Sequence, residues 1–66
     1  MITTAFYDRI KPGDWVRSEG WPTFHEVKYV EQRGDMVMID IAVGGLLEAL
    51  APAHCNAKIE VDRSLE

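Results

Sequence analysis

The sequence lacks the features that mark several classes of protein. Cys55 is the only cysteine among 66 residues, so no intramolecular disulfide can form. No apolar run approaches the roughly 18 residues of a membrane span, and the N-terminus lacks the basic-then-apolar layout of a signal peptide. Internal repeats and low-complexity tracts are also missing. These absences predict a cytoplasmic protein with no membrane partner.

Positive charge is also scarce. Seven Lys and Arg stand against eleven Asp and Glu, which gives a net charge of -4. This is the wrong sign for holding a phosphate backbone by charge alone, and it argues against non-specific binding of nucleic acid. The acidic excess comes from the second half of the chain.

The overall composition, 47% hydrophobic and 27% charged, is typical of a globular domain. A chain of 66 residues has room for one domain. We assign residues 1–9 to an N-terminal segment, residues 10–62 to the domain and residues 63–66 to a C-terminal tail. Leu65 and Glu66 resemble the remnant of a cloning site placed before a purification tag.

Apolar side chains alternate most clearly along residues 36–43. Val37, Ile39 and Ile41 fall on one face of a strand, and Asp40 falls on the other. β-branched residues at every second position suit a pleated strand and would crowd a helix.

The preceding segment, residues 24–32, has Val27 and Tyr29 in phase and Val30 out of phase, which predicts a bend or bulge. Residues 33–35 supply the turn that joins the two strands, with Gly34 available for a positive φ.

Shorter elements complete the pattern. Residues 46–50 fit either a strand or a helical turn, and Pro52 favours the strand because it pushes the preceding residue toward extended geometry. The other expected elements are a turn at residues 11–14, strands at residues 15–17 and 58–62, a loop at residues 18–23 and a 3-10 turn at residues 52–56. Five short strands separated by Gly and Pro turns predict a small all-β barrel or sandwich. Its expected core is Val16, Val27, Val37, Ile39, Ile41, Ile59 and Val61.

The order of these elements resembles the SH3-like small β-barrels, the superfamily that includes KOW and Tudor-type domains. The resemblance rests on residues 10–16, which open the barrel, the hairpin through Gly34 and Asp35, the break at Gly44 and Gly45, and residues 51–54 before the last strand. It covers residues 10–62. It implies a single five-stranded SH3-like barrel with a short 3-10 turn before the last strand.

Four of the six aromatic residues lie within fifteen positions, and they suggest a ligand-binding surface. In an SH3-like barrel, the loop between the first strands borders the usual peptide groove. The predicted ligand-binding residues are Trp15, Trp21 and Phe24, flanked by the acidic Glu19 and Asp35. The alternative is that Trp21 and Phe24 fold over the open end of the barrel and complete its small core.

Chemistry-bearing clusters are hard to find in the sequence. His25, His54 and Cys55 do not follow a metal-binding spacing, and adjacent residues point in different directions in an extended segment. The acidic residues fall on expected solvent faces, and Gly44 and Gly45 precede two leucines rather than a phosphate loop. We therefore predict no catalytic residue, no cofactor and no metal.

The predicted function is a small, non-catalytic interaction module that recognises a protein or peptide segment through an aromatic and acidic surface. One alternative is an enzyme that works as a homo-oligomer of small barrels. The other is a barrel that binds RNA or DNA through Arg9, Lys11, Arg17, Lys28 and Arg33.

Overall fold

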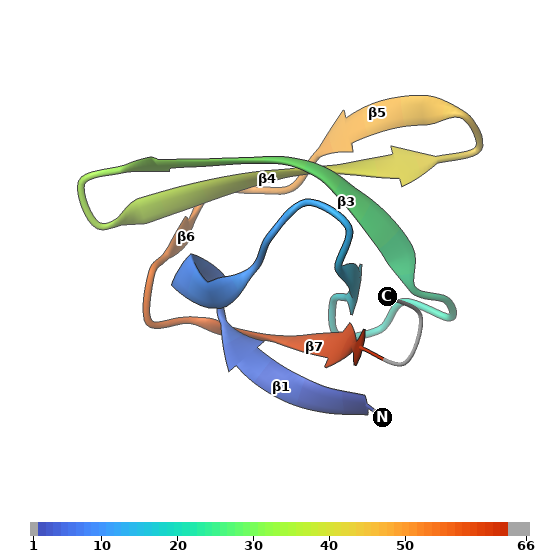
Figure 1. The fold of residues 1–66 in the computed structure, drawn as a ribbon, viewed down its shortest axis with the longest axis horizontal. Helices are drawn as coiled ribbons and strands as arrows, with labels where there is room; N and C mark the ends of the chain where they lie inside the picture. The colour runs from blue at the N-terminus through green and yellow to red at the C-terminus, as the bar shows by residue number, and fades with distance from the viewer. Residues whose placement is uncertain (1, 64–66) are drawn as a thin grey trace.

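A computed structural model describes residues 2–63 as an all-β domain (Figure 1). Its strands are β1 (Ile2–Phe6), β2 (Trp15–Arg17), β3 (His25–Arg33), β4 (Met36–Val43), β5 (Leu46–Ala49), β6 (Ala53–His54) and β7 (Lys58–Asp62). One turn of 3-10 helix, η1 (Tyr7–Arg9), follows β1. The predicted all-β class is confirmed. Leu65 and Glu66, the proposed cloning remnant, lie outside the described residues.

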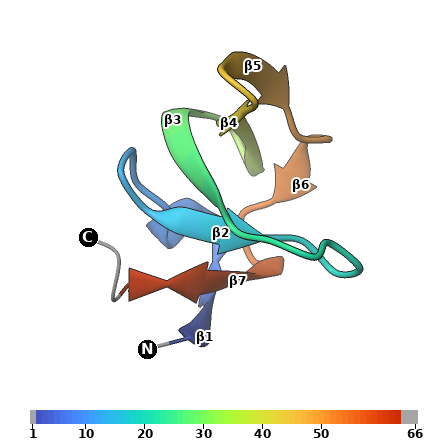
Figure 2. The ribbon, with the colours of Figure 1, turned by 90° about the vertical axis from the view of Figure 1, so that its right-hand side faces the viewer.

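The strands form one antiparallel sheet that folds over its own core. The strand order is β1-β7-β2-β3-β4-β5, with β6 added beside β4, so the path runs from β1 to β5 without closing. The start of β3 pairs with β2 and its remainder pairs with β4. Figures 1 and 2 show the result, with β1 and β7 on one side of the core and β3 and β4 on the other.

The five expected strands are present as β2, β3, β4, β5 and β7, but the sheet has seven strands rather than five. The additional β1 lies within the N-terminal segment and pairs with β7 from Ile2 opposite Asp62 to Phe6 opposite Lys58. The expected 3-10 turn at residues 52–56 is replaced by β6 and a turn, because Ala53 pairs with Val37 at the start of β4. The 3-10 geometry occurs at η1 instead.

The core agrees with the alternation seen in the sequence. All seven predicted residues are buried, and Ile10 joins them. The acidic side chain of Asp14 is buried with them, 3% exposed. Its carboxylate accepts a hydrogen bond from the Lys11 backbone N–H at 2.9 Å and lies 3.7 Å from the Arg63 guanidinium. These partners compensate the cost of burying a charged group.

The expected irregularity in β3 is a shift of register between Val27 and Tyr29. Val27 is fully buried, Val30 packs against the core, and the two side chains between them, Lys28 and Tyr29, are both exposed. An ordinary strand would turn one of two neighbours inward. The extra residue therefore lets two consecutive side chains reach solvent. The β3–β4 turn follows the prediction, with Gly34 at φ 58°.

Candidate functional site

The residues expected to bind a ligand lie in two separate parts of the fold. Trp15 belongs to β2, and Glu19, Trp21 and Phe24 lie in the segment between β2 and β3. Asp35 lies in the β3–β4 turn, at the opposite end of the nine-residue β3. The structure therefore brings Trp21 and Phe24 into one loop with Glu19, and it places Asp35 elsewhere.

The loop aromatics are engaged in contacts within the protein. Trp21 is half-buried against the core, and its ring meets that of His25 edge-on with centroids 5.4 Å apart. The Arg17 guanidinium lies 4.6 Å from the centroid of the Phe24 ring. Arg17 also pairs with Glu60 of β7 at 2.6 Å, which fixes the guanidinium. These contacts favour the alternative for Trp21, which packs against the core, and they engage the Phe24 ring with Arg17.

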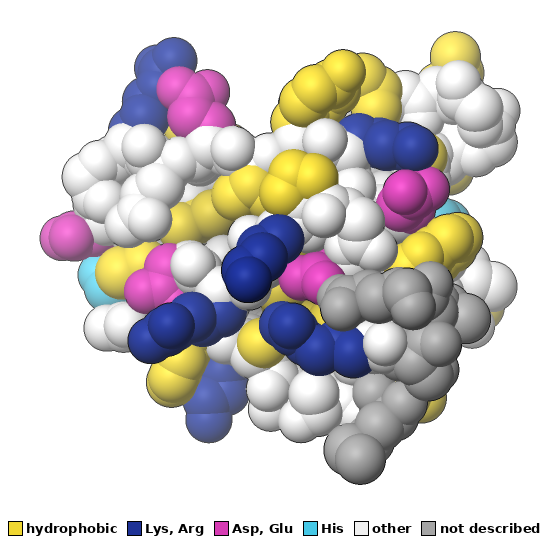
Figure 3. Space-filling model, viewed as in Figure 1, with side chains coloured by type: hydrophobic (Ala, Val, Ile, Leu, Met, Phe, Trp, Pro, Cys, Tyr) yellow, Lys and Arg dark blue, Asp and Glu magenta, His cyan; other side chains and the backbone are white. Residues whose placement is uncertain are grey.

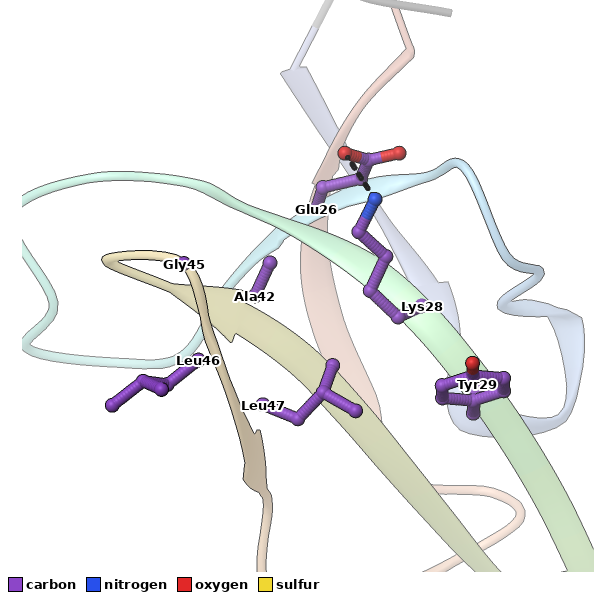
Figure 4. Close-up of a pocket in the computed structure, with 7 residues that line it drawn as sticks. All are labelled: Glu26, Lys28, Tyr29, Ala42, Gly45, Leu46 and Leu47. Atoms are coloured by element: carbon purple, nitrogen blue, oxygen red, sulfur yellow. Dashed lines mark ion pairs between the residues drawn. The ribbon is translucent and has the colours of Figure 1, made fainter.

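Large exposed hydrophobic side chains gather on a different surface, over β3, β4 and β5. Tyr29 is 61% exposed, Leu46 73% and Leu47 55%. Together with Glu26, Lys28, Ala42 and Gly45 they line an open hollow of about 590 Å³. Figure 4 shows the Leu47 side chain pointing toward Lys28 and Tyr29, with Leu46 pointing away from them. We call the surface formed by Tyr29, Ala42 and Leu47 the Tyr29 face. Leu46 lies opposite Val43, on the other face of β5, and borders the hollow at its edge.

Strand register explains why these side chains meet. Tyr29 lies opposite Asp40, and Ala42 lies opposite Leu47. Directly opposed residues of antiparallel strands share a face of the sheet. Because Asp40 and Ala42 alternate with the buried Ile39 and Ile41, they lie on the outward face. The Tyr29 ring and the Leu47 side chain therefore cover the same outer side of β4.

A second hollow, of about 460 Å³, adjoins the first at Tyr29. Its lining is Tyr29, Val30, Glu31, Met38, Asp40, Ala49, Leu50 and Pro52. Both hollows are lined from β3, β4 and β5, and they follow one another along these strands. Tyr29 thus stands between two neighbouring depressions, the second of which carries acidic side chains.

Basic residues proposed for nucleic-acid contact are largely neutralised by carboxylates. Three of the five form ion pairs: Arg17 with Glu60 at 2.6 Å, Lys28 with Glu26 at 3.2 Å, and Arg33 with Glu31 at 2.6 Å. On the face seen in Figure 3, basic and acidic side chains are interspersed. A phosphate backbone needs a coherent positive surface, and these pairs do not provide one.

Two features outside the Tyr29 face bear on chemical reactivity: the Tyr7 phenol and a cluster of three potential metal ligands. Burial raises the pKa of the Tyr7 phenol above its ordinary value of 10.0, which keeps it protonated. Asp35, His54 and Cys55 place one potential metal-ligand atom each within 4.8 Å of the others. His54 and Cys55 do not share an extended segment as expected, because the strand ends at His54 and Cys55 begins a turn.

No protein-family model matches the chain, and neither curated proteins nor solved structures give a significant match. Within residues 2–63, the structure contains no helix of the length and apolar character needed to cross a membrane.

The sequence analysis missed Tyr29, Leu46 and Leu47 as surface residues. A signal was available in each case. The predicted irregularity in β3 allows neighbouring side chains to share the outer face. Consecutive leucines in a strand place one apolar side chain on each face of the sheet. At least one of Leu46 and Leu47 is therefore expected to point away from the core and to be exposed to solvent.

Proposed function

We propose that the protein is a non-catalytic interaction module with an SH3-like barrel architecture, which acts in the cytoplasm by binding an extended segment of another protein. The observation that carries the proposal is the exposure of Tyr29 and Leu47 on one face of the sheet, beside an open hollow that Leu46 borders. Tyrosine beside aliphatic side chains supplies apolar area and a polar hydroxyl with few rotatable bonds, a combination enriched at protein interfaces.

The shape of the surface supports an extended ligand. The two hollows follow one another along β3–β5, with Tyr29 between them. An extended segment advances about 3.3 Å per residue and points alternate side chains the same way. Alternate apolar side chains of such a segment would enter the hollows while its backbone passes beside the Tyr29 ring.

The charge of the protein indicates which kind of peptide segment it binds. The protein carries a net charge of -4, and Asp40 lines the second hollow beside Glu31, whose carboxylate is paired with Arg33. Basic side chains on the ligand would gain attraction and a faster association rate, while apolar side chains supply buried area. The expected ligand is therefore a segment that combines Lys or Arg with aliphatic residues.

A peptide-display selection on the immobilised protein tests this proposal. We expect enriched peptides that combine basic and aliphatic residues. Tyr29→Ala should weaken their binding about thirtyfold, since loss of an interface anchor costs about 2 kcal/mol. Because the ring is mainly exposed, the variant should melt close to the parent. Isothermal titration calorimetry and thermal melts measure the two effects.

Phe6→Ala is the matched control, because Phe6 is also an exposed aromatic residue, 42% exposed, but lies on β1. It should bind the selected peptides like the parent. Failure to enrich any peptide family, or equal binding by Tyr29→Ala and the parent, would contradict the proposal. A stable homo-oligomer that Tyr29→Ala dissociates, measured by light scattering, would show that a second copy occupies the face instead.

A further inference from the structure

A mixed cluster of potential metal ligands forms at the end of the domain where the β3–β4 turn meets β6. Asp35 lies in that turn, His54 ends β6, and Cys55 starts the turn that follows. Their ligand atoms all lie within 4.8 Å of one another. The Cys55 Sγ and the His54 Nδ1 are 3.8 Å apart. Residues about twenty positions apart in the sequence thus present a thiol, an imidazole and a carboxylate to one point.

Backbone pairing holds this cluster together. Met36 of β4 lies opposite His54 of β6, so the turn containing Asp35 ends directly beside the histidine. The Cys55 N–H donates to the Asp35 carbonyl at 2.7 Å. The Ala57 N–H donates to the His54 carbonyl at 2.8 Å and closes the second turn. The ligand-bearing backbone is therefore fixed by hydrogen bonds on both sides, which lowers the ordering cost of binding an ion.

The donor set suits a borderline-soft divalent cation. Thiolate, imidazole and carboxylate are the three common zinc ligands, and their distances to the metal place S and N about 3.6 Å apart in a tetrahedral site. The observed 3.8 Å between the Cys55 Sγ and the His54 Nδ1 needs only a small adjustment.

The hydrogen bond to the His54 ring also favours binding of a metal ion at its Nδ1. The Asn56 N–H donates to the His54 Nδ1 at 3.1 Å, so this nitrogen presents its lone pair. A cation bound there would take the place of that donor. The Asn56 Oδ1, 3.9 Å from the Cys55 Sγ, is a neighbouring oxygen available for the fourth position, which water could also fill.

We propose that Asp35, His54 and Cys55 form a binding site for a zinc-class divalent cation. A bound ion joins the β3–β4 turn to the connection between β6 and β7, so it stabilises the folded chain. The acidic second half of the chain, which contains all three ligands, favours a cation there. The site is separate from the Tyr29 face and does not depend on the function proposed for it.

Cobalt titration of the tag-free chain tests the site, since an appended histidine tag would itself bind the metal. We expect one equivalent of Co²⁺ to produce the visible absorption of a tetrahedral centre and a thiolate-to-cobalt charge-transfer band. Zn²⁺ should displace it and raise the melting temperature. Cys55→Ser should abolish the charge-transfer band, and Asp35→Asn and His54→Gln should each weaken binding at least tenfold.

The matched control is His25→Gln, which removes the chain's other histidine and should leave the cobalt spectrum unchanged. Circular dichroism of each metal-free variant checks that the fold is retained. The proposal is overturned if Co²⁺ gives no charge-transfer band. It is also overturned if folded Cys55→Ser or His54→Gln binds as tightly as the parent, or if saturation is not reached at millimolar metal.

Discussion

Ile39→Ala should lower the free energy of unfolding by about 2–5 kcal/mol, the cost of lost burial plus the cavity left behind. Ile39 is fully buried at the centre of β4, where it faces the side chains of the sheet folded over it. A domain of this size has a total stability near the lower end of the usual range, about 5 kcal/mol. The variant should therefore retain only about 0–3 kcal/mol of stability, which ranges from marginally folded to the midpoint of unfolding at room temperature.

Urea denaturation followed by circular dichroism measures this loss. Met36→Ala is the control on the same strand, since Met36 is 41% exposed and should change stability by less than about 1 kcal/mol. An Ile39→Ala protein as stable as the parent would mean that this face of β4 does not form the core.

Trp21→Ala should have the second-largest effect and lower the free energy of unfolding by about 2 kcal/mol or more. Trp21 packs against the core and meets His25 edge-on, so its removal exposes buried apolar surface and loses an aromatic contact. Trp15→Ala is the comparison. The Trp15 ring faces away from the core because its neighbour Val16 is fully buried, so its loss should cost clearly less.

Denaturation curves of both tryptophan variants, recorded by circular dichroism, decide the point. If Trp15→Ala were the more destabilised variant, the assignment of Trp21 to the core would be wrong. If neither substitution changed stability, the aromatic residues of the β2–β3 segment would again be candidates for a ligand-binding surface.

The core could be predicted because its signal is local. In β4, Val37, Ile39 and Ile41 alternate with outward residues, and burial follows this alternation. The bulge in β3 was predictable for the same reason, since Val30 departs from the phase of Val27. β1 could not be recognised in this way. It is an edge strand that pairs only with β7, and its side chains show no alternation of burial.

The sites depend on long-range pairing, which the sequence does not display. The Tyr29 face forms because Ala42 pairs with Leu47 and because the bulge turns Tyr29 outward. Neither the pairing nor the direction of the bulge can be read from the sequence. The proximity of Asp35 to His54 requires the two-residue β6 to pair with the start of β4. Pro52 suggested a turn in that region, and a strand of two residues is too short to show any periodicity.

Backbone amide chemical shifts recorded during titration with a display-selected peptide locate the bound segment on the protein. If the segment binds the Tyr29 face, the shift changes should concentrate at Lys28, Tyr29, Ala42 and Leu47, with few changes between β2 and β3. Changes centred on Trp21 and Phe24, with the β3–β5 surface unaffected, would contradict it and would place ligand recognition in the aromatic loop.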